Sequence, residues 1–208
     1  TRQCLILTTE PLSIPVMTHI PKVMKYPRVG DIQKTELRAE VVVSSVLFVD
    51  SMKLIGIAGS LRKTSCNLGL LRYCKGVLEA HGARFDIIPQ SLVGSLPLFN
   101  EELEGRDLSS VHEYREYLDD ADGFIFATCE YNGSISAPLK NALDWGSREG
   151  NAFDGKPVSI IGAGGYAGTT RAQGHLRDIC YNLNMRNLTG GFGSGLEIRI
   201  QIFQDTPK

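Results

Sequence analysis

The sequence lacks the features that mark membrane proteins, secreted proteins and nucleic-acid-binding proteins. No apolar run approaches the roughly 20 residues that a membrane-spanning helix needs. Lysine and arginine number 22 against 23 aspartates and glutamates, for a net charge of −1. No basic surface for nucleic acid is indicated, and the N-terminus does not have the pattern of a secretory signal. We therefore predict no nucleic-acid partner and no membrane partner.

Cysteine and histidine are scattered, and no nucleophile motif is present. The five cysteines are an odd number without a C-x-x-C pair, and the four histidines show no metal-ligand spacing. We therefore expect reduced thiols, a cytoplasmic location and no metal site. There is no G-x-S-x-G elbow, and Cys129 has no histidine near it in the sequence. No catalytic side chain is predicted.

The first 51 residues differ from the rest of the chain. Four prolines fall before residue 30, so a long helix does not fit there. Residues 1–51 are predicted to be a poorly ordered N-terminal extension, with Met52 as an alternative start directly before the first clear strand. Residues 52–208 are predicted to form one domain.

From residue 53 onward, short apolar runs alternate with segments of helical period. The predicted strands are residues 53–58, 84–89, 123–129, 156–163 and 196–203. The predicted helices are residues 66–81, 107–120, 136–148 and 169–183. Such alternation predicts an α/β fold, a five-stranded parallel sheet with helices on both faces. Ligands of such sheets bind beyond the carboxyl ends of the strands.

The loop after the first predicted strand, GSLRKTSCN at 59–67, has groups that suit an anion. Its hydroxyl and amide side chains can donate to phosphate oxygens, and Arg62 can add a charge-assisted contact. The N–H groups of the following helix point the same way. It is not a Walker A loop, because no second glycine precedes Lys63. The alternative is that Ser65 merely caps the helix and the cations are solvated.

A second loop, CEYNGS at 129–134, follows the third predicted strand. Tyr131 offers a flat face, while Asn132 and Gly133 tolerate unusual backbone angles that expose N–H groups. Such a loop can hold one edge of a heteroaromatic ring. The alternative is an ordinary strand-to-helix turn with an exposed tyrosine.

A third loop, GAGGYAG at 162–168, superficially fits a dinucleotide fingerprint. That fingerprint belongs on the first strand–helix unit with an acid about 20 residues on. Here Asn182 and Asn184 lie where the acid should be, so we reject it. What remains is a glycine loop that lets a planar ligand approach the backbone. Three such loops without acid–base residues indicate a cofactor that carries the chemistry itself.

At these residues the chain resembles the NADPH-dependent FMN reductase family, in particular its NAD(P)H:quinone reductase members. The matching motifs are GSLRKTSxN at 59–67, PLFNEEL at 97–103, EYNGSISAPLKNALDW at 130–145 and RAQxHLRxI at 171–179. The resemblance implies a flavodoxin-like three-layer α/β/α fold that binds FMN without a covalent bond. It implies hydride transfer from NAD(P)H through flavin N5 to quinones or similar small-molecule acceptors, among them chromate, azo compounds and free flavin. It also implies a homodimer or homotetramer.

The same resemblance implies three groups of cofactor-binding residues. The FMN phosphate would be held by Ser60, Arg62, Ser65 and Asn67. The isoalloxazine ring would be lined by Glu130, Tyr131, Asn132 and Gly133. The far edge of the ring would be closed over by Gly164, Gly165 and Tyr166.

The chain also departs from the family pattern. Cys129 stands where the family usually has proline, Gly174 where it commonly has tyrosine, and TGGFGSG at 189–195 resembles an insertion. Family members continue into a final helix beyond the position of Lys208, so that helix is expected to be missing and the chain to be a truncated product.

Two other functions stay open at this point. One is an FMN-binding electron carrier without NAD(P)H activity, although such carriers tend to be strongly acidic and the net charge here is −1. The other is a truncated, non-catalytic remnant, which the missing helix motivates. Trp145 is predicted to be a core residue, with a subunit interface on its helix as the alternative.

Overall fold

The chain folds around a parallel β-sheet, and the computed structural model describes residues 52–165, 168–188 and 198–201. The strands are β1 (Lys53–Ala58), β2 (Arg84–Ile87), β3 (Gly123–Thr128), β4 (Pro157–Gly164), β5 (Arg186–Asn187) and β6 (Ile198–Gln201). The helices are α2 (Cys66–Ala80), α3 (Gln90–Ser95), α4 (Ser109–Asp119), α5 (Ala137–Gly146) and α6 (Thr170–Asn182), and Glu101–Leu103 form a 3₁₀ turn.

The strands lie in the order β2-β1-β3-β4-β5, and every pair in the sheet is parallel. The fifth place in the sheet consists of two pieces. Strand β5 pairs with Pro157 and Val158 at the start of β4, and β6 pairs with the end of β4 from Ile161 to Gly164. The predicted five-stranded parallel sheet is confirmed in this form, and the insertion predicted at 189–195 lies outside the described residues.

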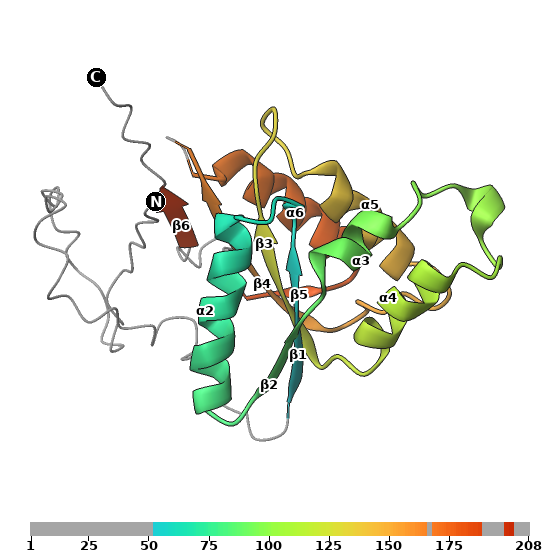
Figure 1. The fold of residues 1–208 in the computed structure, drawn as a ribbon, viewed down its shortest axis with the longest axis horizontal. Coiled ribbons are helices and arrows are strands. Elements are labelled where there is room, and N and C mark those ends of the chain that lie inside the picture. The colour runs from blue at the N-terminus through green and yellow to red at the C-terminus, as the bar shows by residue number, and fades with distance from the viewer. Residues whose placement is uncertain (1–51, 166–167, 189–197, 202–208) are drawn as a thin grey trace, which may run out of the picture. The chain divides into compact units, whose positions relative to one another are not determined.

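Helices lie on both faces of the sheet (Figure 1). Of the helices within the described ranges, α2 lies on one face, while α3, α4, α5 and α6 lie on the other. The handedness of the crossovers explains this division. The connection from β1 to β2 runs across the sheet in the opposite direction to those from β3 to β4 and from β4 to β5, and right-handed crossovers of opposite direction use opposite faces. The expected three layers are present.

Local sequence signals explain where α2 begins and ends. Ser65 is its N-cap, and the side chain accepts a hydrogen bond from the N–H of Leu68. Leu71, Cys74 and Leu78 lie three or four residues apart and are buried against the sheet. The chain turns away at Gly82, whose φ of 88° costs a glycine little. Predicted and observed limits therefore agree closely.

The main apolar core lies between the sheet and helices α3 to α6. Phe124 and Phe126 of β3 make edge-on contacts with Phe153, at centroid distances of 5.1 and 6.1 Å. Gly146 at the end of α5 allows this packing, because a Cβ there would lie 2.5 Å from Phe153 Cζ. Trp145 is 3% exposed, so its prediction as a core residue is confirmed.

Two elements were not indicated by the sequence pattern, namely α3 and β5. Helix α3 has six residues and β5 has two. Neither is long enough to show a hydrophobic period, which is the main signal for an element in a sequence. Helix α3 nevertheless matters for the site, because its first residue contacts the loop after β1.

Candidate cofactor site

Three loops meet at the carboxyl ends of the central strands β1, β3 and β4. Because these strands are parallel neighbours, their ends lie at the same edge of the sheet. The loops leave the strands at Gly59, Cys129 and Gly165 respectively. The fold therefore brings together the three loops that the sequence analysis singled out, at the point where the strand order reverses between β1 and β3.

In the first loop, both predicted serines are buried and accept backbone hydrogen bonds. Ser60 Oγ accepts from the N–H of Arg62 at 3.4 Å, and Ser65 Oγ accepts from the N–H of Leu68 at 3.3 Å. The capping role considered for Ser65 is thus confirmed. It leaves the hydroxyl proton available, so a serine can cap the helix and still donate to a ligand.

The same loop also contains backbone N–H donors that no described residue uses. Within the ranges that the structure describes, the N–H groups of Leu61, Lys63 and Thr64 have no hydrogen-bond acceptor. Arg62 is exposed and forms no ion pair with a described residue. These donors lie directly before α2, where the helix dipole also favours a negative charge. The donor set fits a phosphate group.

Asn67 is 3% exposed and connects α2 to β4. Its Nδ2 donates to the carbonyl of Ala163 at 3.1 Å, and its Oδ1 accepts from the N–H of Ala163 at 2.8 Å. The amide therefore holds the end of β4 beside the first loop. The Nδ2 group of Asn67 has a second proton, and only that proton can form the predicted hydrogen bond with the phosphate.

The second loop is a tight turn that projects from the sheet edge. Tyr131 and Ser134 exchange two backbone hydrogen bonds of 3.0 and 3.1 Å. The residues between them, Asn132 and Gly133, have φ values of 52° and 75°. Two positive φ values in a two-residue turn are the pattern of type I′, which Asn-Gly favours. Tyr131 is 56% exposed, which fits both a ring that lines a ligand and the alternative of an ordinary turn with an exposed tyrosine.

Glu130 lies at the start of this loop but turns toward α6. Its Oε2 accepts hydrogen bonds from the N–H groups of Arg171 and Ala172 at 2.9 and 3.0 Å. A carboxylate at a helix N-terminus satisfies free donors and interacts favourably with the dipole. His175 of α6 adds a second connection, because its Nδ1 lies 3.0 Å from Ser134 Oγ. The second loop and α6 therefore form one unit.

The third loop follows β4 and folds back on itself. Gly168 donates to the carbonyl of Gly165 at 2.9 Å. A Cβ at Gly164 would overlap the carbonyl of Gly168, and a Cβ at Gly162 would overlap the Thr169 hydroxyl. Gly165 is exposed and has open space where a Cβ would point. The bare backbone at Gly165 suits a planar ligand, and Tyr166 lies outside the described residues.

Three residues to which the sequence analysis assigned no part in the site, Ser136, Cys129 and Gln90, contact the first loop. Ser136 caps α5 and donates to the carbonyl of Gly59, and Cys129 Sγ lies 3.5 Å from that same oxygen. Gln90, the first residue of α3, donates to the carbonyls of Ser60 and Arg62. A serine two residues before Pro138 was a recognisable capping signal. Nothing local marks Gln90, whose partners lie 28 and 30 residues away.

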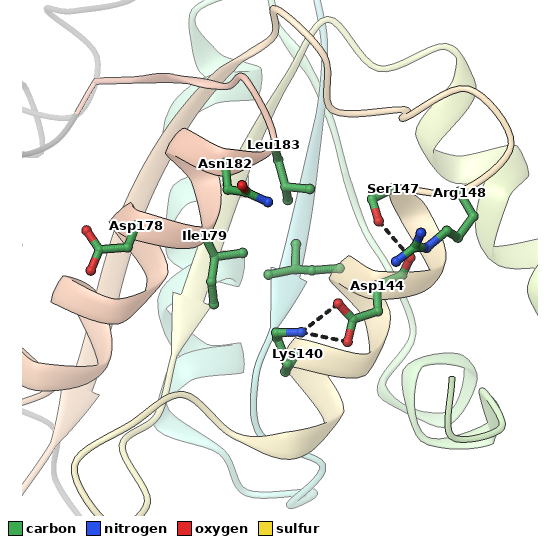
Figure 2. A pocket seen from close by; sticks show the side chains of 9 residues that line it. Lys140, Asp144, Ser147, Arg148, Asp178, Ile179, Asn182 and Leu183 are labelled. Atoms are coloured by element: carbon green, nitrogen blue, oxygen red, sulfur yellow. Dashed lines mark hydrogen bonds and ion pairs between the residues drawn. The ribbon is translucent and has the colours of Figure 1, made fainter. Parts of the chain in front are cut away.

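A cavity of about 330 Å³ lies away from these loops, between α5 and α6 (Figure 2). Lys140 and Asp144 form an ion pair there, with Nζ–O distances of 2.6 and 2.8 Å. Apolar surface comes from Leu143, Ile179 and Leu183. None of the residues predicted to bind the cofactor lines this cavity. It is therefore separate from the three-loop site.

Within the described ranges, histidine, cysteine, aspartate and glutamate form no cluster that could hold a metal ion. No helix in the same ranges has the length and apolar character that crossing a membrane requires. Burial raises the pKa of the Cys74 thiol from its ordinary 9.0 to about 11 and that of Cys180 to about 12. Neither thiol belongs to the three loops, and both are neutral at physiological pH.

Comparisons with known proteins point to one family. The model described as NADPH-dependent FMN reductase matches residues 52–195. The NADPH:quinone oxidoreductase of Arabidopsis thaliana is 42% identical over 132 residues, which cover 62% of this chain and 66% of the relative. The NAD(P)H:quinone oxidoreductase of Solanum tuberosum is 38% identical over 164 residues, 76% of this chain and 79% of the relative.

Among solved structures, the flavoenzyme NAD(P)H:(acceptor) oxidoreductase FerB of Paracoccus denitrificans superposes with a TM-score of 0.59. The two chains are 27% identical, and the match covers 66% of this chain and 75% of FerB. The residues that the family model matches include strands β1 to β5 and the three loops.

Proposed function

The chain belongs to the NADPH-dependent FMN reductase family, and on that premise we propose that its three-loop site binds FMN. The protein is an FMN-dependent NAD(P)H oxidoreductase that reduces quinones or similar small acceptors. The observation that carries the assignment is the first loop. Backbone donors and an arginine that have no partner among the described residues converge there with a helix N-terminus. This is the donor set that a flavin phosphate requires.

Each loop has a distinct part in binding. In the first loop, Arg62, the two serines and the free N–H groups would hold the phosphate. In the second, the turn at Asn132 and Gly133 would present its backbone and the Tyr131 ring to one edge of the flavin. In the third, the bare backbone at Gly165 would allow close approach to the other edge.

The other residues of the site have supporting tasks. Glu130 fixes α6 against the second loop, and Asn67 fixes the end of β4 against the first. When bound, FMN would supply the redox chemistry, namely the transfer of a hydride equivalent from NAD(P)H to a quinone. We assign no protein acid or base to this reaction, because solvent can supply the protons that quinone reduction requires.

The first test is a visible spectrum of the purified full chain after incubation with FMN and gel filtration. Flavin bands that stay with the protein, followed by steady NADPH oxidation with 1,4-benzoquinone, are the expected result. Retained flavin without NADPH oxidation would instead favour the electron carrier. A colourless protein would favour the non-catalytic remnant.

A matched pair of variants locates the phosphate. Arg62→Ala should weaken FMN binding about tenfold, the effect of losing one charge-assisted hydrogen bond. Arg84→Ala removes an exposed arginine at the amino end of β2, the opposite end from the three loops, and should leave FMN affinity unchanged. Equal effects of the two substitutions would contradict the assignment.

We also propose that the chain acts as a homodimer or homotetramer. The cavity between α5 and α6 combines apolar side chains with charges of both signs, and Tyr181, elsewhere on α6, is 86% exposed. Exposed aromatic and apolar groups of this kind are enriched at subunit interfaces. Multi-angle light scattering should give a mass of two or four chains, and Ile179→Asp should reduce it. A monomer at all concentrations would contradict the proposal.

A cytoplasmic location is proposed as well. The four cysteines in the described ranges are all free thiols, as expected in a reducing compartment. Subcellular fractionation should find the protein with soluble cytoplasmic markers. Recovery from a secreted fraction with oxidised cysteines would contradict it.

A further inference from the structure

A second cavity, of about 470 Å³, lies beside the carboxyl end of β2, and we call it the β2 cavity. It is bounded by the loop after β1, the first two turns of α2 and the start of α3. Leu61, Leu68 and Pro89 give it apolar surface, while Lys63 and Arg72 give it positive charge. The β2 cavity therefore combines an apolar wall with two cationic side chains from different elements.

The charge of the β2 cavity is of one sign. Among the described residues that line it, none is an aspartate or a glutamate. Lys63 and Arg72 are exposed, and neither forms an ion pair with a described residue. Lys75, further along α2, differs because Glu79 and Asp86 lie 3.0 and 4.0 Å from its ammonium group. The two cations at the cavity are thus available to an anionic ligand.

The lining of the β2 cavity indicates which kind of anion fits it. A guanidinium such as that of Arg72 can bind a carboxylate through two parallel hydrogen bonds and can also stack on an aromatic face. Lys63 adds a second positive charge, and Leu68 and Pro89 offer apolar surface to a ring. The volume is within the usual range for small-molecule sites. An aromatic carboxylate is complementary to all of these features, whereas an inorganic anion would leave the apolar wall unused.

The β2 cavity lies on the phosphate side of the three-loop site. Its walls include the loop after β1, but no described residue of the loops at 129–134 and 162–168 lines it. Those two loops are the ones expected to contact the flavin ring. A ligand in the cavity would therefore not take the place of an electron acceptor at the ring, and its role would be that of an effector.

The loop after β1 is shared by the β2 cavity and the predicted phosphate site. Leu61 and Lys63 line the cavity, and Arg62 between them is predicted to hold the FMN phosphate. Gln90 lines the cavity as well and donates to the carbonyls of Ser60 and Arg62. A ligand that contacts the loop, α2 and α3 together would restrain the loop before FMN binds. Such preorganisation lowers the cost of ordering that FMN binding has to offset.

From these observations we infer that the β2 cavity binds an aromatic carboxylate and, on the premise of the proposed function, that this ligand strengthens FMN binding through the shared loop. The carboxylate lies between Lys63 and Arg72, and the ring packs on Leu68 and Pro89. Because coupling between two binding sites is reciprocal, FMN strengthens binding of the carboxylate by the same factor.

The first test is isothermal titration calorimetry on the full chain saturated with FMN. Three probes are compared, namely 2-naphthoate, 2-naphthamide, which has the ring without the charge, and acetate, which has the charge without the ring. We expect 2-naphthoate to bind at least about tenfold more tightly than either control, as the loss of a charge-assisted contact or of the ring contacts requires. Equal affinity for 2-naphthoate and either control, or no binding of 2-naphthoate, would overturn the inference.

A double variant then locates the bound carboxylate. Lys63→Gln with Arg72→Gln should abolish the preference for 2-naphthoate over 2-naphthamide, because the amide side chains carry no charge. Arg84→Gln, at the amino end of β2, is the matched control and should leave that preference unchanged. Flat rings can also stack on a flavin. An unchanged preference in the double variant would therefore place 2-naphthoate outside the β2 cavity and overturn the inference, as would an equal change in the control.

The coupling is measured from the FMN side by flavin fluorescence. Saturating 2-naphthoate should lower the Kd of FMN about fivefold or more, and FMN should lower the Kd of 2-naphthoate by the same factor. An unchanged Kd of FMN would overturn the effector role.

These outcomes separate the inference from the proposed function. If the chain does not bind FMN, the proposed function fails, and calorimetry on the chain without FMN still decides whether the β2 cavity binds 2-naphthoate. If FMN binds and NADPH is oxidised but 2-naphthoate does not bind, the function stands and the inference fails.

Discussion

The core under α3 to α6 and the carboxyl edge of the sheet bury side chains of different kinds. The core consists of aromatic and aliphatic groups such as Phe124, Phe126 and Phe153, in contact through their edges and faces. Most of the buried polar side chains lie at the edge instead, and they are Ser60, Ser65, Asn67, Thr128, Ser136, Thr169 and Gln173.

The two regions are therefore stabilised in different ways. In the core, stability depends on the apolar area removed from water and on close packing. At the edge, polar side chains of one element satisfy the backbone of another, as Asn67 does for Ala163 and Ser136 for Gly59. A buried polar group that loses its partner costs about 1–3 kcal/mol. The edge is thus sensitive to small chemical changes, and the core to changes of volume.

The largest effect should come from the core. Phe153→Ala removes a fully buried ring that two other rings contact, and we expect the free energy of unfolding to fall by about 3–5 kcal/mol. Denaturant titration measures this fall. Leu98→Ala is the control, because that side chain is 79% exposed. Its free energy of unfolding should stay within about 0.5 kcal/mol of the unsubstituted protein. A similar result for both substitutions would mean that the core is not closely packed.

At the carboxyl edge of the sheet, the expected effects depend on whether there is room for a Cβ next to the backbone. Gly162→Ala places a methyl group against the Thr169 hydroxyl and 2.7 Å from the carbonyl of Thr128, so we expect a loss of about 3 kcal/mol and weaker FMN retention. At Gly165 a Cβ would point into open space, so Gly165→Ala should lower the free energy of unfolding by less than about 1 kcal/mol. Thermal melting and flavin retention are the measurements. If the two variants have the same melting temperature, the close contact at Gly162 is absent in solution.

The next effect concerns directional bonding. Asn67→Ala leaves both polar groups of Ala163 without a partner, and we expect a loss of about 2 kcal/mol in the free energy of unfolding. Asn67→Asp keeps an acceptor for the N–H but loses the donor to the carbonyl. Ser95→Ala, which removes a hydrogen bond on the exposed side of α3, is the control and should cost less than about 1 kcal/mol. A variant of unchanged stability would contradict the role of this amide in holding the end of β4.

The buried thiols make stability depend on pH. Cys74 and Cys180 have folded-state pKa values of about 11 and 12, above the ordinary 9.0 of the unfolded chain. Below pH 9 both states are protonated and the full stability is present. Above pH 9 the unfolded state loses protons first, so stability falls by up to about 1.4 kcal/mol per pH unit for each thiol until the folded pKa is reached.

Unfolding titrations between pH 8 and 10.5 measure this slope. A Cys74→Ala and Cys180→Ala double variant should show a smaller slope, whatever its stability at pH 8. An identical slope in the variant would assign the dependence to other groups.

The smallest effect should be a gain in stability. Gly174 lies inside α6, and a Cβ there would meet nothing within 4 Å. Gly174→Ala should raise the free energy of unfolding by about 0.5–1 kcal/mol, because it reduces the freedom of the unfolded chain. Gly146→Ala is the matched control in α5 and should destabilise, since its Cβ would lie 2.5 Å from Phe153 Cζ. A loss of stability in Gly174→Ala would show that this position does have a neighbour in solution.

Much of the fold could be predicted because the relevant signals are local. The apolar run at 53–58 and the helical period after Ser65 correspond to β1 and α2. The turn at Asn132 and Gly133 follows from residues that tolerate positive φ. The short elements α3 and β5 could not be predicted, because six and two residues are too few for a repeating hydrophobic pattern to be recognised.

What the sequence by itself determined is the set of elements and the chemistry available in the three loops, because propensity, periodicity and side-chain type act over a few neighbouring residues. Only the tertiary structure decided what those side chains contact. Asn67 bonds a residue 96 positions away, Glu130 caps a helix 41 positions on, and Gln90 reaches back to the first loop. Which residues become such partners depends on how the chain crosses the sheet, and this path cannot be inferred from a local pattern in the sequence.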